Sequence, residues 1–426
     1  MISPNGLIEK LKSGVYNDAL SLVYPGKEKE NALRLCDVAN DFCDIFGADE
    51  REFSIFSAPG RTEVCGNHTD HNHGQVLAAA ISLDAVAVAA KRDDGIIRIK
   101  SAGYDMDEIN INALEPDTDE FSKSAGLIRG IAARFKQLGY KIGGFDAATA
   151  SNVLKGSGMS SSAAFEVLVG TILNYLYNEG KIDAVEIAKI SQYAENVYFG
   201  KPCGLMDQMA CSVGGFVNID FCDPSVPVIK KIDFDFEKCG HCLCITDTKG
   251  DHSDLTDEYA AVRGEMESVA SFFGKNVLRE ADEKEFTENI SDIRAKFGDR
   301  AVLRAMHFYA ENRRVAKQVE SLNRGDFEAF KATETESGFS SFMYNQNVYT
   351  CTDTKNQPVS LGLAISEKIL SGCGAWRVHG GGFAGTIQAF VPADKAEEYT
   401  AAMKAVFGEN CCHILKIRQA GGVKLV

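Results

Sequence analysis

A run of glycine and serine residues is the stretch whose residue types point most directly to chemistry. Residues 155–164 read Lys-Gly-Ser-Gly-Met-Ser-Ser-Ser-Ala-Ala, and a run that predicts a helix follows from Ala163 to Leu176. Glycine lets a backbone approach a ligand closely, and a helix start presents unpaired N–H groups and a partial positive charge that suit phosphate. The stretch indicates a phosphate-binding loop, with a flexible loop and a serine N-cap as the alternative. It is not a Walker motif, because no Gly-Lys-Ser/Thr closes it.

A second polar cluster lies between residues 59 and 74. His68, His71 and His73 fall within six residues, with Asp70 between them. Neutral imidazoles are good zinc ligands, so a zinc hydrolase is one hypothesis. The spacing matches no common zinc motif, and on a strand or helix His68 and His73 would point apart.

Composition and charge narrow the class of protein. The length of 426 residues predicts two or three domains, and the net charge of -15 argues against nucleic acid as a partner. No apolar stretch reaches the length of a membrane span, and the start lacks the pattern of a secretory signal. The thirteen scattered cysteines fit reduced thiols. We therefore expect a cytoplasmic monomer that acts on small molecules, with no membrane partner.

The elements that must position these polar residues can be predicted from periodicity and turn residues. Residues 53–57 predict a short strand, and the polar run from Arg61 to Gly74 predicts a loop or short helix. Asp93-Asp94-Gly95 between two β-rich runs predicts a hairpin. The other expected strands are 145–150, 243–248, 386–391 and 412–417. The other expected helices are 5–12, 28–46, 124–138, 183–198, 254–272, 280–297, 299–322 and 357–370. The mixture predicts an α+β fold with a boundary near residue 222.

Four stretches, in the same order along the chain, resemble the motifs of a known enzyme family, the GHMP small-molecule kinases. Residues 59–77 are similar to the galactokinase signature of that family, and residues 156–164 to its phosphate loop. Residues 192–208 are similar to its catalytic segment, and residues 380–386 to its third motif. The resemblance implies a GHMP kinase fold with an N-terminal domain (1–222), a ferredoxin-like C-terminal domain (223–426) and the active site between them.

The resemblance also implies a reaction, in which the γ-phosphoryl group of ATP, with Mg²⁺, moves to the C1 hydroxyl of a sugar such as galactose. Asp207 is then the expected base and Arg61 the cation that can lower its pKa. The structural alternatives are that Asp207 is a turn aspartate and that Arg61 forms a surface ion pair. Ser162 and Glu195 are the expected magnesium ligands, although Glu195 also fits a solvated helix face. The residues expected at the phosphates are Gly156, Ser157, Gly158, Met159, Ser160, Ser161 and Ser162.

Sugar recognition is expected from residues of three motifs. The carboxylate of Asp70 can accept two hydroxyl hydrogen bonds, and Gly204 would let the backbone approach the sugar. Tyr259 resembles a family tyrosine that touches the sugar, and it also fits a helix tyrosine that packs on the core. The remaining expected sugar contacts are Asn67 and His68.

Several positions depart from the family pattern. Glu63 stands where galactokinases have Asn, Asn67 where they have the Glu that contacts the sugar, and His71 where they have Tyr. Leu154 and Ala384 replace a Pro and a Gly. An amide can donate as well as accept a hydrogen bond, so the change at Asn67 alters the expected preference among sugar groups. A kinase for a related sugar, such as an N-acetylhexosamine or a pentose, and a sugar- and ATP-binding sensor without turnover are the alternatives.

Overall fold

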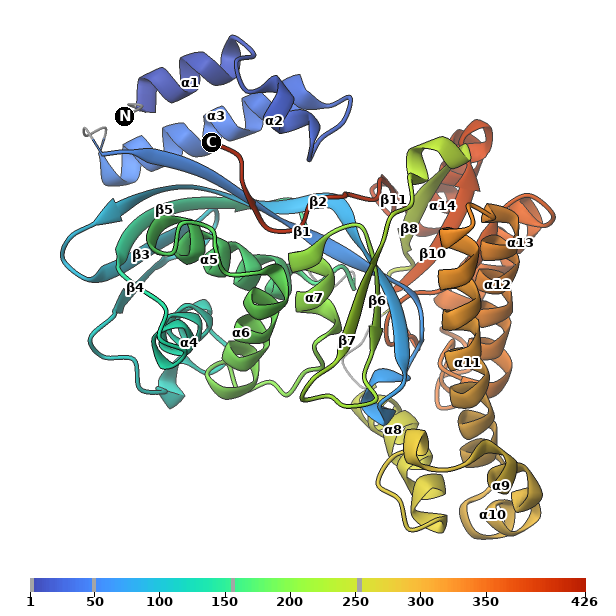
Figure 1. Cartoon of the computed structure of the whole chain (residues 1–426). Helices are drawn as coiled ribbons and strands as arrows, with labels where there is room; N and C mark the ends of the chain where they lie inside the picture. Colours follow the sequence, from blue (N-terminus) through green and yellow to red (C-terminus); the bar gives the residue numbers. More distant parts are fainter. Residues whose placement is uncertain (1–3, 48–50, 155–157, 251–254) are drawn as a thin grey trace.

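The computed structural model describes residues 4–47, 51–154, 158–250 and 255–426. These segments form two β-sheets with helices on their faces, and a small helical lobe projects from one end (Figure 1). The fold is α+β, as predicted. Within the described segments, no helix is both long enough and apolar enough to cross a membrane.

Eight strands of the described segments form the first sheet. Its order is β12-β1-β2-β5-β3-β4, and β6 and β7 continue it from β2. All thirteen residues of β1 are buried, as are most of those in β2, because helices or other strands cover both faces of the sheet centre. The strands are β1 (Phe53–Cys65), β2 (Gln75–Arg92), β3 (Ile96–Ser101), β4 (Met106–Asn110), β5 (Gly144–Ser151), β6 (Phe216–Asp220), β7 (Val228–Ile232) and β12 (Val423–Lys424).

The expected hairpin around Asp93-Asp94-Gly95 is wrong. The chain does turn there, but β5 lies between β2 and β3, antiparallel to β2 and parallel to β3. β5 reaches this place only after α4 (Ser124–Gln137) has carried the chain back to the sheet. Turn chemistry predicts where a chain reverses, whereas the neighbour of a strand is decided by long-range pairing.

The polar run after Pro59 is partly a strand, contrary to the expected loop. β1 continues through Arg61 and Glu63 to Cys65, and its pairing with β2 is irregular between Pro59 and Arg61 and between Glu63 and Cys65. Only Asp70–Asn72 is helical, as one 3₁₀ turn. Irregularities of this kind re-aim the side chains of a strand, and here they lie on both sides of the polar residues of β1.

Two groups of helices cover the first sheet (Figure 1). On one face, α3 packs on β2 and β5, while α5 and α7 pack on β1 and β2 from the other. The predicted helices at 124–138, 163–176 and 183–198 are confirmed, and Asp183 caps the last by accepting the Glu186 N–H. The helices are α1 (Pro4–Lys12), α2 (Asn17–Ser21), α3 (Glu28–Phe46), α5 (Ser161–Tyr177), α6 (Ala184–Val197) and α7 (Met206–Val213).

The second sheet has four strands within the described part of the chain, in the order β11-β8-β10-β9. They are β8 (His241–Asp247), β9 (Ala375–Val378), β10 (Thr386–Pro392) and β11 (Cys412–Leu415). Because successive strand residues point to opposite faces, Phe390 of β10 meets Phe330 of α12 (Phe327–Ser340), while Ala389 and Val391 pack in the cluster of α13 (Pro358–Leu370) and α14 (Ala396–Phe407). The predicted helix at 299–322 is confirmed as α11 (Asp299–Asn323), which lies beside α12.

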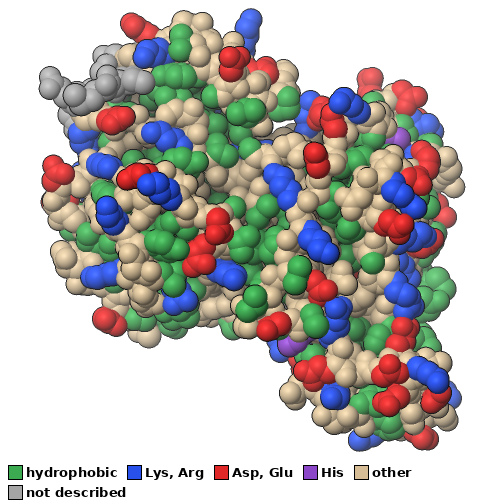
Figure 2. Space-filling model, in the orientation of Figure 1, with side chains coloured by type: hydrophobic (Ala, Val, Ile, Leu, Met, Phe, Trp, Pro, Cys, Tyr) green, Lys and Arg blue, Asp and Glu red, His purple; other side chains and the backbone are tan. Residues whose placement is uncertain are grey.

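The projecting lobe holds α8 (Thr256–Phe272), α9 (Glu283–Glu288) and α10 (Ile290–Phe297), and it is visible at the lower right of Figure 2. The predicted single helix at 280–297 is wrong, because α9 and α10 are separate and meet at Asn289. Asp282 caps α9 by accepting the N–H groups of Lys284 and Glu285, so this helix has a start of its own. Asp254, where the helix before the lobe was expected to begin, lies outside the described residues.

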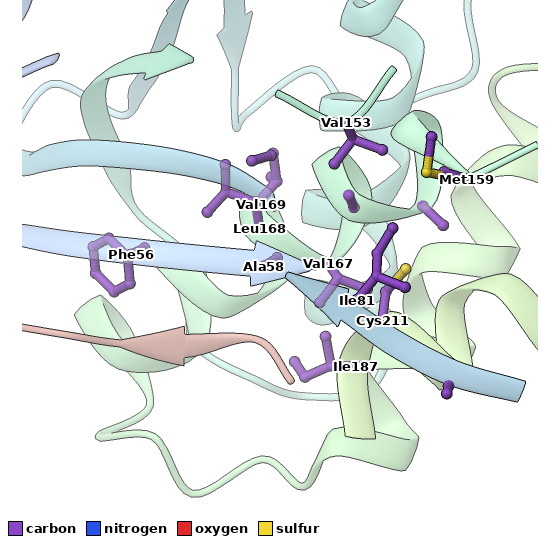
Figure 3. Close-up of a cluster of buried hydrophobic side chains, with 14 of the residues drawn as sticks. Phe56, Ala58, Ile81, Val153, Met159, Val167, Leu168, Val169, Ile187 and Cys211 are labelled. Atoms are coloured by element: carbon purple, nitrogen blue, oxygen red, sulfur yellow. The ribbon is translucent and has the colours of Figure 1, made fainter. Parts of the chain in front are cut away.

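One apolar core joins the two sheets. Phe56 and Val167, labelled in Figure 3, belong to the same cluster of buried side chains as Phe330 and Phe390 of the second half. β7 and β12 come from beyond residue 222 and pair with β6 and β1 of the first sheet. The division at residue 222 stays a prediction, and these strands tie the two parts of the chain together.

Candidate active site

Arg61 and Asp207 form a two-pronged ion pair between β1 and α7. Arg61 Nε lies 2.8 Å from Asp207 Oδ1, and Nη2 lies 2.7 Å from Oδ2, although the residues are 146 positions apart. The side chain of Arg61 is 9% exposed and that of Asp207 30%. Burial raises the pKa of Asp207, but the Arg61 guanidinium and the Ser160 hydroxyl outweigh it, and the pKa is lowered. Asp207 is therefore a carboxylate at neutral pH, fixed in orientation.

The loop before α5 holds this ion pair from a second side. Ser160 Oγ donates to Asp207 Oδ2, and the Gly158 carbonyl accepts a hydrogen bond from Arg61 Nη1. The Met159 carbonyl accepts the Arg61 N–H at 3.1 Å. The loop expected to bind phosphates thus touches both the expected cation and the expected base.

The described residues of this loop, from Gly158 onward, have a backbone that suits the expected contact with phosphates. Gly158 and Ser160 have φ of +69° and +59°, and Ser161 and Ser162 begin α5, whose first N–H groups have no partner inside the helix. The Met159 side chain is fully buried in the core beside Val153 (Figure 3), so it anchors the loop and only its backbone faces the site. Gly156 and Ser157, also expected at the phosphates, lie outside the described residues.

Behind this loop lies a pair of buried carboxylates. Gln208 Nε2 donates to Glu195 at 2.7 Å and to Glu166 at 3.0 Å, and Lys201 Nζ lies 3.1 Å from Glu195. Glu195 is 2% exposed, so the solvated helix face considered for it is wrong. Burial, with the charge of Glu195, holds the pKa of Glu166 well above its usual range. Sequence reasoning missed Glu166, although a lone carboxylate in the otherwise apolar α5, one turn after Ser162, was a usable signal.

The expected sugar residues lie against the loop before α7 and against the third motif. A Cβ placed on Gly204 would lie 2.9 Å from Asp70 Oδ2, so the loop before α7 passes directly against Asp70. Burial and the nearby charge of Glu63 raise the pKa of Asp70. His68 Nε2 lies 2.8 Å from the Gly381 carbonyl. Tyr259 donates its hydroxyl to the Gly382 carbonyl at 2.9 Å, and burial raises its pKa to about 12.

The glycine-rich third motif closes the site from the second half of the chain. A Cβ placed on Gly158 would lie 3.3 Å from Nδ1 of His379, which also lies 2.9 Å from the Thr386 hydroxyl. His379 Nε2 accepts the Glu63 N–H at 3.3 Å. Burial, with Arg61 nearby, holds the pKa of His379 well below its usual range, so the ring is neutral. His379 was not among the expected residues, and its place before the glycines of the third motif was the available signal.

Asn67 does not face the site in the way that was expected. It is 1% exposed, and its Nδ2 donates to Glu63 Oε1 at 2.9 Å and to the Gly380 carbonyl at 2.7 Å. Its Oδ1 accepts from Asn347 Nδ2 at 2.8 Å and from the Ser341 hydroxyl at 3.2 Å. These four bonds use the full capacity of a side-chain amide.

The histidine cluster forms no metal centre among the described residues, where no group of three or more His, Cys, Asp or Glu side chains has suitable geometry. The rings of His68 and His71 lie 5.6 Å apart at 55°, and His71 Nδ1 lies 2.9 Å from Asn72 Nδ2. Burial holds the pKa of His71 well below its usual range. The position of His68 beside Gly381 connects it to the third motif.

Two sequence-family models match the chain in the regions that build this site. The one described as the GHMP kinases N terminal domain matches residues 126–215, which include the loop before α5 and Asp207. The one described as the galactokinase galactose-binding signature matches residues 40–91, which include Arg61 and Asp70.

Solved structures share the fold over nearly their whole length. A galactokinase from Lactococcus lactis, solved in complex with galactose, matches with a TM-score of 0.76 and 23% identity, over 92% of this chain and 99% of that chain. A mevalonate kinase from Methanococcus jannaschii matches with a TM-score of 0.61 and 16% identity, over 87% of this chain and 99% of that chain. Together with the cradle, the ion pair and the third motif, these similarities define the GHMP kinase fold.

Sequence relatives narrow the class further. The galactokinase of Streptomyces coelicolor is 32% identical over 377 residues, which cover 87% of this chain and 92% of the relative. The galactokinase of Clostridium tetani is 29% identical over 372 residues, which cover 86% and 91%. The chain belongs to the galactokinase family.

Proposed function

We propose that this protein is an ATP-dependent galactokinase, which transfers the γ-phosphoryl group of ATP to the C1 hydroxyl of galactose. The observation that carries the proposal is the contact of Asp207 with both Arg61 and Ser160. It brings a carboxylate base, a buried cation and the phosphate cradle to one point. Phosphoryl transfer depends mostly on such positioning and on neutralisation of charge.

The roles of the residues follow from this arrangement. The carboxylate of Asp207 accepts the proton of the C1 hydroxyl while the sugar oxygen bonds to the γ-phosphorus and the bond to ADP breaks. Because the pKa of Asp207 is lowered, the proton moves late, as the attacking oxygen loses electron density. Arg61 and the N–H groups at the start of α5 stabilise the negative charge on the phosphates.

Magnesium is part of this proposal, and the residues behind the cradle suit it. Mg²⁺ prefers oxygen ligands, and the Ser162 hydroxyl and the Glu195 carboxylate lie on neighbouring helices. Glu166 Oε1, one turn after Ser162, is buried without a hydrogen-bond partner among the described residues. Ser162 and Glu195 would hold the ion, which would supply positive charge beside the phosphates.

The sugar would lie against residues of both halves of the chain. Asp70 and His68 present a carboxylate and an imidazole, and the absence of a side chain at Gly204 lets the loop before α7 lie directly against Asp70. Tyr259 stands at the Gly382 end of the third motif, where its ring packs edge-on against Phe383. Asp70, being a pure acceptor when ionised, can distinguish the orientation of hydroxyl groups.

Replacement of Asp207 tests the catalytic role. Asp207→Asn keeps the shape and removes the carboxylate that can take up the proton, so we expect kcat to fall by about 10²–10⁴-fold, the usual contribution of a general base. Galactose binding, measured by titration calorimetry, should persist within a few-fold. Asp207→Ala, which also releases Arg61, should lose at least as much. Unchanged turnover in Asp207→Asn would remove Asp207 as the base.

A sugar panel tests the substrate and the alternatives. The purified protein is incubated with ATP and galactose, glucose, N-acetylgalactosamine or arabinose, and ADP release is measured. Galactose should give the highest kcat/KM. A faster reaction of another sugar would replace galactose as the substrate, and binding of sugar and ATP without ADP release would favour a sensor. Monomeric state and cytoplasmic location stay predictions, and sedimentation and fractionation test them.

A further inference from the structure

Glu63 is a buried carboxylate on the strand that carries Arg61. The two residues are two positions apart on β1, so their side chains leave the strand on the same face. Glu63 is 7% exposed. Carboxylates are rarely buried to this extent unless other groups satisfy both oxygens.

Only one oxygen of Glu63 is satisfied by the described residues. Oε1 accepts from Asn67 Nδ2 at 2.9 Å and lies 3.3 Å from Arg377 Nη2. Oε2 has no hydrogen-bond partner there. The bonds to Asn67 and Arg377 therefore fix the orientation of the carboxylate and leave one lone acceptor oxygen available.

The surroundings of that carboxylate belong to the sugar site. Burial, together with the charge of Glu63, raises the pKa of Asp70. The charges of Asp207 and Glu63 raise the pKa of Arg61. The backbone N–H of Glu63 donates to His379. The negative charges of Glu63 and Asp70 repel each other when both are ionised in one site. Hydrogen-bond donors from a neutral ligand reduce the free-energy cost of this repulsion. A sugar carries several hydroxyl donors without adding negative charge.

Asn67, by contrast, has no capacity left for a ligand. Its amide is bonded on all four sides by Glu63, Gly380, Asn347 and Ser341. Three of these partners lie far along the chain, so Asn67 joins β1 to the second half and holds Glu63 in place.

We propose that Glu63 binds the sugar and determines specificity, with Oε2 accepting a hydrogen bond from one sugar hydroxyl, and that Asn67 is a positioning residue for Glu63. This rests on the proposed sugar kinase activity. A carboxylate only accepts, so Glu63 requires a donor at the matching sugar position and disfavours a hydrogen or fluorine there. Glu63 and Asn67 thus act together: the carboxylate of Glu63 on β1 binds the sugar, and the amide of Asn67 after the strand holds that carboxylate in place.

Deoxy and fluoro analogues of galactose test this role. Each hydroxyl except C1 is replaced in turn, and kcat/KM is measured for the wild type, Glu63→Gln and Glu63→Asp. In the wild type we expect kcat/KM to fall about 10²-fold or more when the hydroxyl that faces Glu63 is removed, because its acceptor oxygen is then left without a donor. In both variants the fall in kcat/KM on removal of that hydroxyl should be at least tenfold smaller than in the wild type. The falls at the other positions should stay within threefold of their wild-type values. Glu63→Asp keeps the charge opposite Arg377, so it tests the oxygen position if Glu63→Gln folds poorly.

Asn67→Ala provides the matched comparison. It should lower kcat/KM for every sugar by a similar factor and keep the same hydroxyl as the critical one. A critical hydroxyl that changes with Asn67→Ala and persists in both Glu63 variants would overturn the proposal. Equal penalties in the wild type and the Glu63 variants would also overturn it, because Glu63 would then be structural. If the sugar panel replaces galactose, the same comparison is made with analogues of the sugar that reacts, so failure of the galactose assignment and failure of the Glu63 role remain distinct.

Discussion

At the scale of single residues, the proposed mechanism depends on how Asp207, the proposed base, is placed. The lowered pKa of Asp207 makes it a poor proton acceptor in equilibrium terms, but it guarantees the ionised form at neutral pH. Arg61 and Ser160 both bond its oxygens, so orientation compensates for low basicity. The site thus favours precise placement over a pKa matched to the operating pH.

Ser160 gives a direct test of this balance. Ser160→Ala removes a donor to Asp207, so we expect kcat to fall about tenfold, in the range of one lost hydrogen bond to a charged group. The acid limb of the kcat profile should move to higher pH, because a donor to the carboxylate stabilises its ionised form. Stopped-time assays from pH 4 to pH 8 measure both effects.

Ser160→Gly separates the hydroxyl from the backbone. Ser160 has φ of +59°, which glycine adopts without strain, so this variant loses the hydroxyl and relieves the backbone. Both variants should lose activity equally. Recovery of activity in Ser160→Gly alone would attribute the loss to backbone strain and contradict the role of the hydroxyl.

At the scale of elements, α7 is held at both ends. Its first turn carries Asp207, and its last turn lies under the C-terminal segment that leads to β12. A Cβ placed on Gly421 would lie 1.9 Å from the Ser212 carbonyl of α7, which shows how closely the two backbones cross. The tail of the chain therefore helps to fix the helix that carries Asp207.

Gly421→Ala should disturb this crossing. A methyl group cannot fit beside a backbone carbonyl at that distance, so we expect a loss of about 1–3 kcal/mol in the free energy of unfolding. Urea denaturation followed by circular dichroism measures it. Gly264→Ala is the control with the opposite sign. Gly264 is exposed within α8 with open space around it, and alanine there should add about 0.5–1 kcal/mol. A neutral Gly421→Ala would contradict the tight crossing.

At the scale of the whole molecule, a buried polar network joins the two halves. Arg377 of β9 donates to the Val64 carbonyl of β1 at 2.7 Å, and Glu311 of α11 accepts the Gly66 N–H at 3.1 Å. Glu334 of α12 accepts from Gln318 and from Gln388 of β10, each at 2.7 Å. Because these groups are buried, each one needs its hydrogen-bond partner from the other half, and this requirement fixes how the two halves pack.

Glu334 makes the stability of this network depend on pH. Burial outweighs the charge of Arg377 and raises its pKa from 4.5 to about 7. Between these values the folded protein keeps a proton that the unfolded chain has released, so the free energy of unfolding falls as pH rises through this window. Glu334→Gln should remove this term, so its stability relative to the wild type should increase by about 3 kcal/mol between pH 4.5 and pH 8.

Urea denaturation of both proteins across that range measures the difference. His307, whose burial lowers its pKa to about 4, contributes a slope of opposite sign in both proteins, so only the comparison is diagnostic. Parallel pH curves for the two proteins would show that Glu334 titrates normally.

The sequence predicted best where the physics is local. The helices α4, α6 and α11 follow from apolar residues at helical spacing, and the loop before α5 follows from glycine and serine at a helix start. It predicted less well where two distant segments compete. The turn after β2 was recognised, yet the neighbour of β2 is β5, and the polar residues Arg61 and Glu63 lie on a strand because β2 pairs with them.

The sequence by itself determined the family, the α+β class and the residue types of the site, because motifs and amphipathic periods are encoded within a few residues of one another. Only the tertiary structure decided what each polar group faces. Arg61 and Asp207 meet across 146 residues, and the amide of Asn67 is consumed by partners from residues 341, 347 and 380. A polar side chain forms hydrogen bonds with the groups that the fold brings within reach, and long-range packing decides which groups those are. The same packing holds the carboxylate of Glu63, a departure from the family motif, against Asn67 and Arg377.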